Sequence, residues 1–236
     1  MNKLLEAFLD TLYLHKCIVC DSIIYSEGLC ENCKDKLPII SEETCFHCGI
    51  DLKHCECDRY FYHFDGIVAP FFNEGFVKDA IYELKFMHNF KCINYVSSLM
   101  ADYTVQTFGR ENIDLICFVP ASNKSYRRRG FNQSELFAER IAEKLRIPLS
   151  RDKLVKSDKV LTQHILGIND RFTNVRKAYS VNGKVTGKNI LLVDDIKTTG
   201  ATLDECARQL KFAGANAVYC VTALISRKEN EDTDIT

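Results

Sequence analysis

Two adjacent carboxylates, Asp194 and Asp195, end an apolar run in the stretch NILLVDDIKTTGATLDECARQL, which covers residues 189–210. Carboxylates accept hydrogen bonds and do not donate them, so the pair suits the neighbouring hydroxyls of a sugar. The next segment leads into a predicted helix and offers hydroxyls, amides and a glycine, from Thr198, Thr199, Gly200, Ala201 and Thr202. Because amides at a helix start favour an anion, we predict that this turn holds the phosphate on that sugar. An ordinary strand–turn–helix junction is the alternative interpretation.

Eight of the 12 cysteines lie in closely spaced pairs near the N-terminus: Cys17 with Cys20, Cys30 with Cys33, Cys45 with Cys48, and Cys55 with Cys57. Two thiolates in one tight turn can bind one ion, and two such pairs complete a tetrahedral zinc site. We therefore predict two structural Zn²⁺ ions, and the spacing leaves open whether the pairs combine in order or interleave. His47 and His54 are alternative ligands for the second site, although solvated turn positions are favoured for both. The other cysteines lie in apolar segments and are predicted core residues.

A polar, basic loop is predicted after the apolar stretch 114–120, and its run of basic residues consists of Lys124, Arg127, Arg128 and Arg129. Such runs are often only solvated, but this one directly follows a strand that we expect to end at the ligand site. We predict that it binds pyrophosphate or the phosphates of a nucleic acid. Tyr126 and Phe131 are candidates for stacking on bases, with a core anchor favoured for Phe131. Arg171 and Arg176 are candidates to extend the patch.

Apolar runs alternate with amphipathic segments from about residue 64 onward. We predict strands in residues 65–72, 114–120, 189–195 and 217–224, and helices in residues 74–87, 91–108, 132–145 and 202–213. Asn132 is expected to cap the third of these helices, and Glu135 completes a capping-box pattern. Strands without polar alternation, separated by helices, indicate a parallel sheet covered on both faces. Ligands bind beyond the carboxyl ends of such strands, where Pro120 and the two aspartates are expected.

The composition is that of a globular protein with no strong overall charge. The chain has 236 residues, 46% of them hydrophobic and 27% charged, and its net charge is −1. Charged residues interrupt the apolar positions of the first 16 residues, so we predict neither a secretion signal nor a transmembrane segment. We expect a cytoplasmic protein with three parts. They are an N-terminal helix with a double zinc ribbon (1–60), a larger α/β domain (61–228) and an acidic flexible tail (229–236).

Several of these segments resemble known families. LLVDDIKTTGAT is similar to the signature with which type I phosphoribosyltransferases hold 5-phosphoribosyl-1-pyrophosphate. VPASNKSYRRRGFNQSELFAERIA (119–142), IYELKF (81–86) and LGINDRFTNVRKAY (166–179) resemble the ComF family of competence proteins, as does the cysteine-rich segment. The resemblance covers nearly the whole chain except the acidic tail. Two departures are Lys197, at a position that is often small or acidic, and a loose VPASNKS loop.

The resemblance implies a type I phosphoribosyltransferase fold for residues 61–228 and a site for phosphoribosyl pyrophosphate with Mg²⁺. Asp194 and Asp195 would hold the ribose and act as the catalytic residues of an enzyme. A pyrophosphate loop would comprise Ala121, Ser122, Asn123 and Lys124. Lys85 would reach a phosphate of the ligand. The alternative, given equal weight, is that Lys85 is a solvated cation at the end of a helix.

Two functions follow from this resemblance. The first is a competence protein that binds phosphoribosyl pyrophosphate and handles incoming single-stranded DNA beside a helicase-like ATPase. The second is an active phosphoribosyltransferase that acts on a nucleobase or a related acceptor. Because the pocket residues imply binding and do not by themselves imply turnover, the sequence leaves this choice open.

Overall fold

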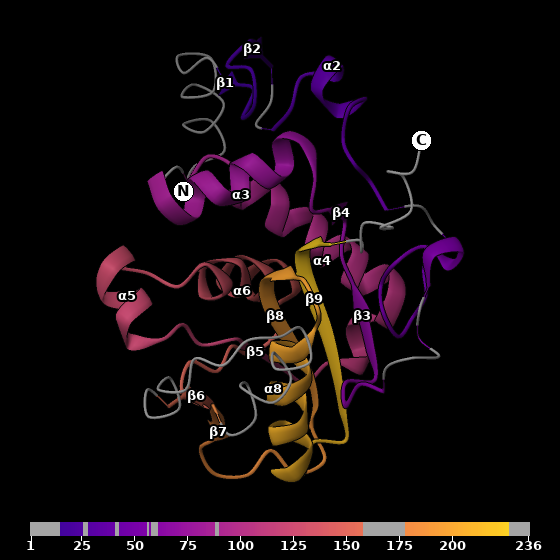
Figure 1. The fold of residues 1–236 in the computed structure, drawn as a ribbon, viewed down its shortest axis with the longest axis vertical. Coiled ribbons are helices and arrows are strands. Elements are labelled where there is room, and N and C mark those ends of the chain that lie inside the picture. Colours follow the sequence, from indigo (N-terminus) through magenta and orange to yellow (C-terminus); the bar gives the residue numbers. More distant parts are fainter. Residues whose placement is uncertain are drawn as a thin grey trace, which may run out of the picture.

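The structure is a computed structural model that describes residues 15–25, 28–40, 43–55, 57, 61–87, 90–157 and 178–226. The predicted first helix, the acidic tail and the positions of Arg171 and Arg176 lie outside these residues. Within them, a parallel sheet forms the centre of the larger part of the chain (Figure 1). Its strands run in the order β3 (Gly66–Val68), β9 (Ala217–Ile225), β8 (Asn189–Lys197) and β5 (Leu115–Phe118), and β4 (Phe71–Phe72) also pairs with β9.

Helices cover both faces of this sheet, as the unbroken apolar strands require. α4 (Ile93–Phe108) and α6 (Gln133–Leu145) pack on one face, while α8 (Ala201–Phe212) packs on the other beside the antiparallel pair of β6 (Leu154–Lys156) and β7 (Tyr179–Val181) (Figure 1). α3 (Gly75–Met87) buries Val77, Ile81 and Leu84 in the same core cluster as α4 and α6, as its apolar spacing predicts. The predicted parallel sheet with helices on both faces is therefore confirmed.

β8 and the predicted strand at 65–72 differ most from the prediction, while β5 is shorter than the predicted 114–120 at both ends. β8 continues through the aspartates to Lys197, because Asp194, Ile196 and Lys197 stay in register with residues 222–225 of β9. The two carboxylates therefore lie within the strand, near its carboxyl end, and not at its tip. The predicted strand at 65–72 is split into β3 and β4 around Pro70, which lacks the N–H that a strand ladder needs.

The basic segment after β5 is a short helix, α5 (Asn123–Arg129), and not the predicted loop. Ser122 caps it, since its hydroxyl oxygen accepts a hydrogen bond from the Ser125 amide at 3.1 Å, and Gly130 ends it with φ +78°. Asn132 caps α6 as predicted and accepts a bond from the Ser134 amide at 3.2 Å. The Glu135 carboxylate does not complete the expected capping box and lies 3.6 Å from Arg151.

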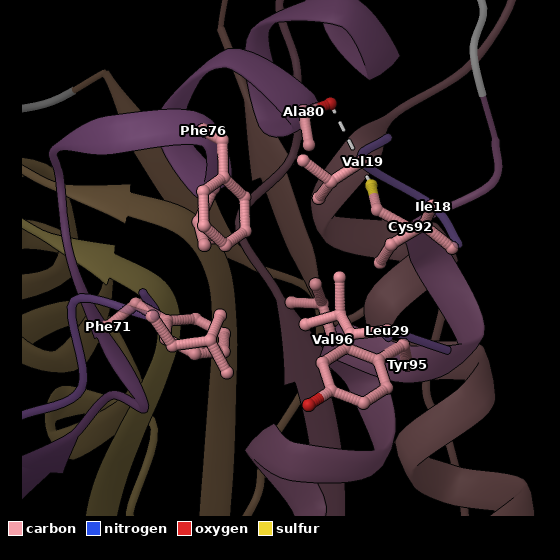
Figure 2. Close-up of a pocket in the computed structure, with 11 residues that line it drawn as sticks. Ile18, Val19, Leu29, Phe71, Phe76, Ala80, Cys92, Tyr95 and Val96 are labelled. Carbon is pink, nitrogen blue, oxygen red and sulfur yellow. Dashed lines mark hydrogen bonds between the residues drawn. The ribbon is translucent and has the colours of Figure 1, made fainter. Parts of the chain in front are cut away.

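The first cysteine quartet belongs to a small unit of β1 (His15–Lys16), β2 (Ile23–Ile24) and α2 (Glu31–Lys34), which packs against α3 and α4. Figure 2 shows Ile18 and Leu29 of this unit lining a small pocket together with Phe76 and Tyr95. None of the residues that line this pocket carries a charge. It is therefore a packing gap and does not suit a phosphorylated ligand.

The second cysteine quartet lies at the β3 edge of the sheet, next to the turn of η1 (Leu52–His54). The Ile67 amide of β3 donates a hydrogen bond to the Phe46 carbonyl at 3.0 Å, and Gly49 lies against Ile225 of β9. These contacts therefore cross the predicted domain boundary between residues 60 and 61. That boundary remains a prediction. No helix in the described part of the chain is both long and apolar enough to cross a membrane.

Candidate functional site

The carboxylate pair lies where the end of β8 meets the start of α6. Asp194 is only 8% exposed, and its Oδ1 accepts hydrogen bonds from the Ser134 hydroxyl at 2.7 Å and from the Asp195 amide at 2.9 Å. Burial, reinforced by the charge of Asp195, raises the pKa of Asp194 from 3.8 to about 7. Ionisation of a carboxyl group in such surroundings costs free energy, and carboxyl groups with a perturbed pKa are common at functional sites.

Asp195 has a cationic partner. Its Oδ2 lies 3.2 Å from the Nζ of Lys85 in the last turn of α3, and both side chains are mostly buried. Lys85 was predicted to reach a ligand phosphate or to be solvated; in the structure it is part of the carboxylate site. The structure thus brings three of the predicted site residues together.

The turn after β8 has the predicted helix start, but its hydroxyls differ in their surroundings. Gly200 adopts φ +80°, a conformation that favours glycine, and it precedes the first residue of α8. Thr198 is exposed, whereas the Thr199 hydroxyl accepts a hydrogen bond from the Ala201 amide at 3.4 Å. Thr202 is half-buried and lies close to the buried Tyr179. Thr198 is therefore the threonine of this turn that faces solvent.

The predicted pyrophosphate loop lies along the start of α5. Ala121 and Ser122 are half-buried, while Asn123 and Lys124 are exposed. The Ser122 hydroxyl is engaged in capping α5, so residues 122–124 form the start of a helix and not a loop.

The arginine run divides into two parts. Arg127 and Arg128 are exposed on α5, whereas Arg129 turns inward and donates to the Gln133 amide oxygen at 2.9 Å. Burial and the nearby Arg128 lower the pKa of Arg129, and the charge of Asp195 opposes this shift. Arg129 therefore belongs with the carboxylate site.

Sequence reasoning missed Gln133, Ser134 and Tyr62. Because a guanidinium only donates hydrogen bonds, Arg129 fixes the amide oxygen of Gln133 toward itself. The amide nitrogen of Gln133 is buried and has no hydrogen-bond partner among the described residues. The only signal in the sequence was the position of Gln133 and Ser134 in the first turn of a helix that follows a basic segment.

The eight N-terminal cysteines form two clusters, and the pairs combine in order. Within each quartet the sulfur atoms all lie within 4.8 Å of one another, and they comprise Cys17, Cys20, Cys30 and Cys33 in the first and Cys45, Cys48, Cys55 and Cys57 in the second. Sulfurs from different pairs of the same quartet are 3.3 to 3.7 Å apart, compared with about 3.8 Å for a tetrahedral zinc site with Zn–S bonds of about 2.3 Å. The donor sets thus fit structural Zn²⁺, with thiols sufficient for both sites.

Hydrogen bonds within the quartets favour the thiolate form at selected positions. Burial alone would raise the pKa of Cys17, but hydrogen bonds from the backbone of Cys20, Cys30 and Val19 outweigh it and lower the pKa to about 6. The same balance lowers the pKa of Cys45 to about 7. Backbone amides directed at sulfur are a common support for a metal-bound thiolate.

Lys197, which departs from the expected pattern, is a buried residue at the end of β8. It is 3% exposed, and its ammonium lies 5.7 Å from the centre of the Tyr62 ring. Burial lowers the pKa of Lys197, and the nearby thiols of Cys48 and Cys57 oppose that shift. The end of β8 is therefore close to the second cysteine quartet.

Two domain families match the chain. The double zinc ribbon domain matches residues 8–60, and the phosphoribosyl transferase domain matches residues 132–235. The second match includes the β8–α8 turn and the residues of α6 that contact Asp194. These matches agree with structural Zn²⁺ in the cysteine clusters and with the parallel sheet described above.

Curated relatives include proteins of DNA utilization and competence. The DNA utilization protein YhgH of Escherichia coli K12 is 31% identical over 141 residues, which cover 58% of this chain and 62% of that protein. The match thus spans less than two thirds of the E. coli relative. Competence protein F of Haemophilus influenzae is 26% identical and covers 86% of this chain and 93% of that protein. For competence protein ComFC of Bacillus subtilis the identity is 26%, with 90% and 96% covered. Likeness to these competence proteins over most of the chain, with both domain families matched, shows that this is a ComF-type protein with a double zinc ribbon and a type I phosphoribosyltransferase fold.

Proposed function

We propose that this protein binds phosphoribosyl pyrophosphate with Mg²⁺ at the carboxyl end of β8 and serves natural competence by handling incoming single-stranded DNA. The observation that carries the first part is the buried Asp194–Asp195 pair, held by Ser134 and Lys85 beside the glycine turn of α8. The carboxylates that can accept hydrogen bonds from two sugar hydroxyls thus lie next to a helix N-terminus that can bind a phosphate. The matched phosphoribosyl transferase family supports the same ligand class.

Each part of this site has a chemical role in the proposal. Asp194 and Asp195 accept hydrogen bonds from the ribose hydroxyls, and Thr198 with the amides of the turn contacts the 5-phosphate. The unpaired amide of Gln133 and the guanidinium of Arg129 are donors for the pyrophosphate, together with Lys124 and the residues 121–123. Carboxylate oxygens are ligands that Mg²⁺ prefers, and the ion would neutralise the phosphate charge when bound.

Isothermal titration calorimetry with phosphoribosyl pyrophosphate and Mg²⁺ tests this site. The variant Asp194→Ala, Asp195→Ala is expected to bind at least about 100-fold more weakly than wild type, because each charged hydrogen-bond acceptor contributes on the order of 1.5–3 kcal/mol. A matched control is Glu74→Ala, Asp79→Ala, since Asp79 is exposed on the outer side of α3 and Glu74 is exposed just before it. Equal binding by wild type and the β8 variant, or none by wild type, contradicts the proposal.

Single-stranded DNA handling is supported by an exposed surface of aromatic and basic side chains beside the ligand site. We call Tyr82, Phe86, Tyr126, Arg127 and Arg128 the aromatic–arginine surface. Phe86 is 55% exposed, and the guanidinium of Arg128 lies 5.9 Å from its ring centre. Bases stack on exposed rings while neighbouring arginines contact the phosphates, which suits a single strand of any sequence. Relatives of this chain are named for DNA utilization and for competence, which supports the same role.

Fluorescence anisotropy with a labelled oligothymidylate tests this surface. The variant Phe86→Ala, Arg127→Ala, Arg128→Ala is expected to bind about 10- to 100-fold more weakly at low salt, since one stacking contact and two phosphate contacts are lost. The salt dependence of log K should also become shallower by about 1.4. The control Arg140→Ala, Lys188→Ala removes two exposed cations elsewhere. If that control weakens binding as much as the test variant does, the DNA site lies elsewhere.

Turnover is the alternative within the same pocket, and the match to the phosphoribosyl transferase domain favours testing it. Pyrophosphate release on addition of a nucleobase would identify an enzyme. Binding of phosphoribosyl pyrophosphate without such release across nucleobases and DNA would identify a ligand-binding competence protein, for which a helicase-like ATPase is the proposed partner.

A further inference from the structure

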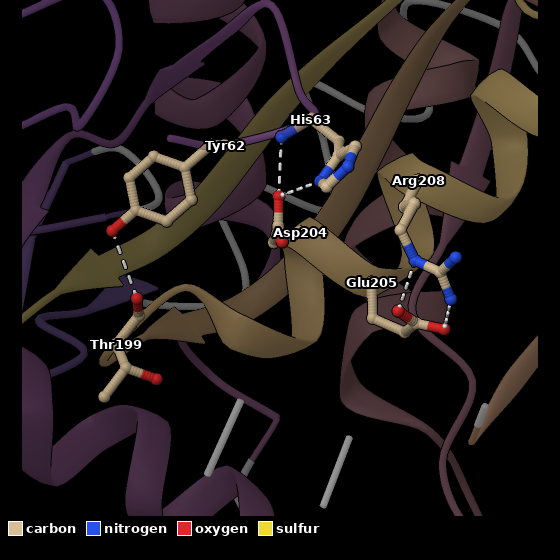
Figure 3. A network of polar contacts seen from close by, with 6 residues as sticks. All are labelled: Tyr62, His63, Thr199, Asp204, Glu205 and Arg208. Atoms are coloured by element: carbon tan, nitrogen blue, oxygen red, sulfur yellow. Dashed lines mark hydrogen bonds and ion pairs between the residues drawn. The ribbon is translucent and has the colours of Figure 1, made fainter. Parts of the chain in front are cut away.

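A segment that directly follows the second cysteine quartet contacts the turn after β8. The Tyr62 hydroxyl donates a hydrogen bond to the Thr199 carbonyl at 3.2 Å (Figure 3). The Tyr62 ring also covers Gly200, because a Cβ added there would lie 3.0 Å from the ring. Phe64, which is buried, stacks on Tyr62 with ring centres 4.6 Å apart and so also restrains the Tyr62 ring. Tyr62 therefore holds the backbone of the proposed phosphate turn.

His63, the residue after Tyr62, contacts the first turn of α8. The backbone amide and the Nδ1 of His63 both lie against the Asp204 carboxylate, with Nδ1 at 3.0 Å (Figure 3). The neighbouring Glu205 points elsewhere and forms a two-bond ion pair with Arg208 within α8. Residues 62–63 thus contact both ends of the segment Thr199–Asp204, and we call them the strap.

The strap is short, and the second quartet is docked beside it. Only a few residues separate Cys57 from Tyr62, and Phe46 and Gly49 of the quartet's first turn pack on β3 and β9. Lys197 lies between the two features, with its ammonium facing the Tyr62 ring and close to the thiols of Cys48 and Cys57. A zinc ion with four thiolates has a net charge of about −2, which a buried ammonium offsets. The first quartet, in contrast, packs against α3 and α4.

We infer that the second zinc centre, through Tyr62 and Lys197, positions the turn after β8 for ligand binding, whereas the first zinc centre serves only to attach its own unit to α3 and α4. The ordering of the turn follows from contacts in the protein itself. Its consequence for affinity rests on the proposed function, namely that this turn binds the phosphate of a phosphorylated sugar. Tyr62 and Lys197 are thus positioning residues and do not themselves contact the ligand.

Hydrogen exchange measured by mass spectrometry on the ligand-free protein tests the inference directly. In Tyr62→Leu we expect the amides of residues 197–204 to exchange about tenfold faster, since a hydrogen bond and a ring contact are lost, while amides of β9 keep their protection. Tyr62→Phe, which removes only the hydroxyl, should give a smaller increase. The matched control is Tyr95→Leu, because Tyr95 packs against Gly28 of the first unit in the same manner. Unchanged exchange at 197–204 in Tyr62→Leu overturns the inference.

Removal of one zinc at a time separates the two centres. Cys57→Ser and Cys20→Ser should each lose one zinc, as measured by elemental analysis, but only Cys57→Ser should accelerate exchange at residues 197–204. If Cys57→Ser does not fold, the Tyr62 variants decide. Equal acceleration in both cysteine variants also counts against the inference.

Calorimetry with phosphoribosyl pyrophosphate and Mg²⁺ then distinguishes the two proposals. Tyr62→Leu is expected to weaken binding about tenfold, in parallel with its faster exchange. Absence of binding by wild type contradicts the proposed function and leaves the exchange result standing as the test of the strap. Binding by Tyr62→Leu equal to that of wild type, with faster exchange, refutes the link between the strap and affinity.

Discussion

Asp194→Asn is expected to make the protein more stable at pH 8 while it removes most of the affinity for phosphoribosyl pyrophosphate. Substitution of a buried polar residue ordinarily destabilises a fold. Here the native residue is a carboxyl whose ionisation is opposed by burial and by the adjacent Asp195. An amide of the same shape removes that charge and still offers an oxygen to the Ser134 hydroxyl. Opposite effects on stability and binding would identify Asp194 as a residue retained for function.

The protonation of Asp194 determines how the stability difference between the variant and wild type changes with pH. The folded protein holds the Asp194 proton up to about pH 7, whereas an ordinary aspartate releases it near 3.8. The stabilising contribution of that proton is fully present below about pH 4 and is lost as the pH rises through 7. The variant should therefore equal wild type near pH 4 and exceed it by on the order of 2–4 kcal/mol at pH 8, since one pKa unit corresponds to about 1.4 kcal/mol.

Urea unfolding at several pH values between 4 and 8 measures this difference. The control is Glu205→Gln, which makes the same isosteric change in a buried carboxylate that has a cationic partner, Arg208, at 2.7 Å. That control should lose stability, because it leaves the guanidinium without its charged partner. If Asp194→Asn loses stability as Glu205→Gln does, then Asp194 is a structural residue and the assignment of the site is wrong.

The elements that sequence predicts well are those whose signal is local. The unbroken apolar runs around Leu192 and Val221 become paired parallel strands, and the spacing of Val77, Ile81 and Leu84 gives the buried face of α3. The cysteine spacing predicts both quartets, because a gap of two residues, or of one between Cys55 and Cys57, fixes a tight turn whatever surrounds it. In each case the pattern that predicts the element lies within one segment.

Contacts between distant segments account for what the sequence did not predict. Ser134 reaches Asp194 only because α6 packs on β8, and Tyr62 meets Thr199 only because the second quartet docks at the sheet edge. α5 was predicted as a loop because its seven residues are mostly polar, so no apolar periodicity indicates a helix there. The inward turn of Arg129 depends on Gln133, which no charge pattern reveals.

Removal of zinc is expected to have the largest effect on the fold. The first unit has a core of only Cys17, Leu29 and Cys33, with a few partly buried neighbours, so the metal must supply much of its stability. Structural zinc contributes on the order of 10 kcal/mol to such small units. A strong chelator at neutral pH should therefore unfold residues 15–57, seen as fast hydrogen exchange there, while β9 and residues 189–196 of β8 stay protected by the main core.

Thiol titration with a coloured disulfide reagent makes this prediction quantitative. Before chelation the eight cysteines of the two quartets should react slowly, because zinc holds their sulfurs; after chelation all eight should react quickly. The four core cysteines, Cys92, Cys117, Cys206 and Cys220, provide an internal control. Burial raises the pKa of Cys92 to about 11 and that of Cys117 to about 12, and it also raises those of Cys206 and Cys220, so these thiols should react only in denaturant. Rapid reaction of all twelve after chelation would show that zinc supports the whole chain and not the ribbons alone, whereas eight fast thiols before chelation would contradict zinc binding.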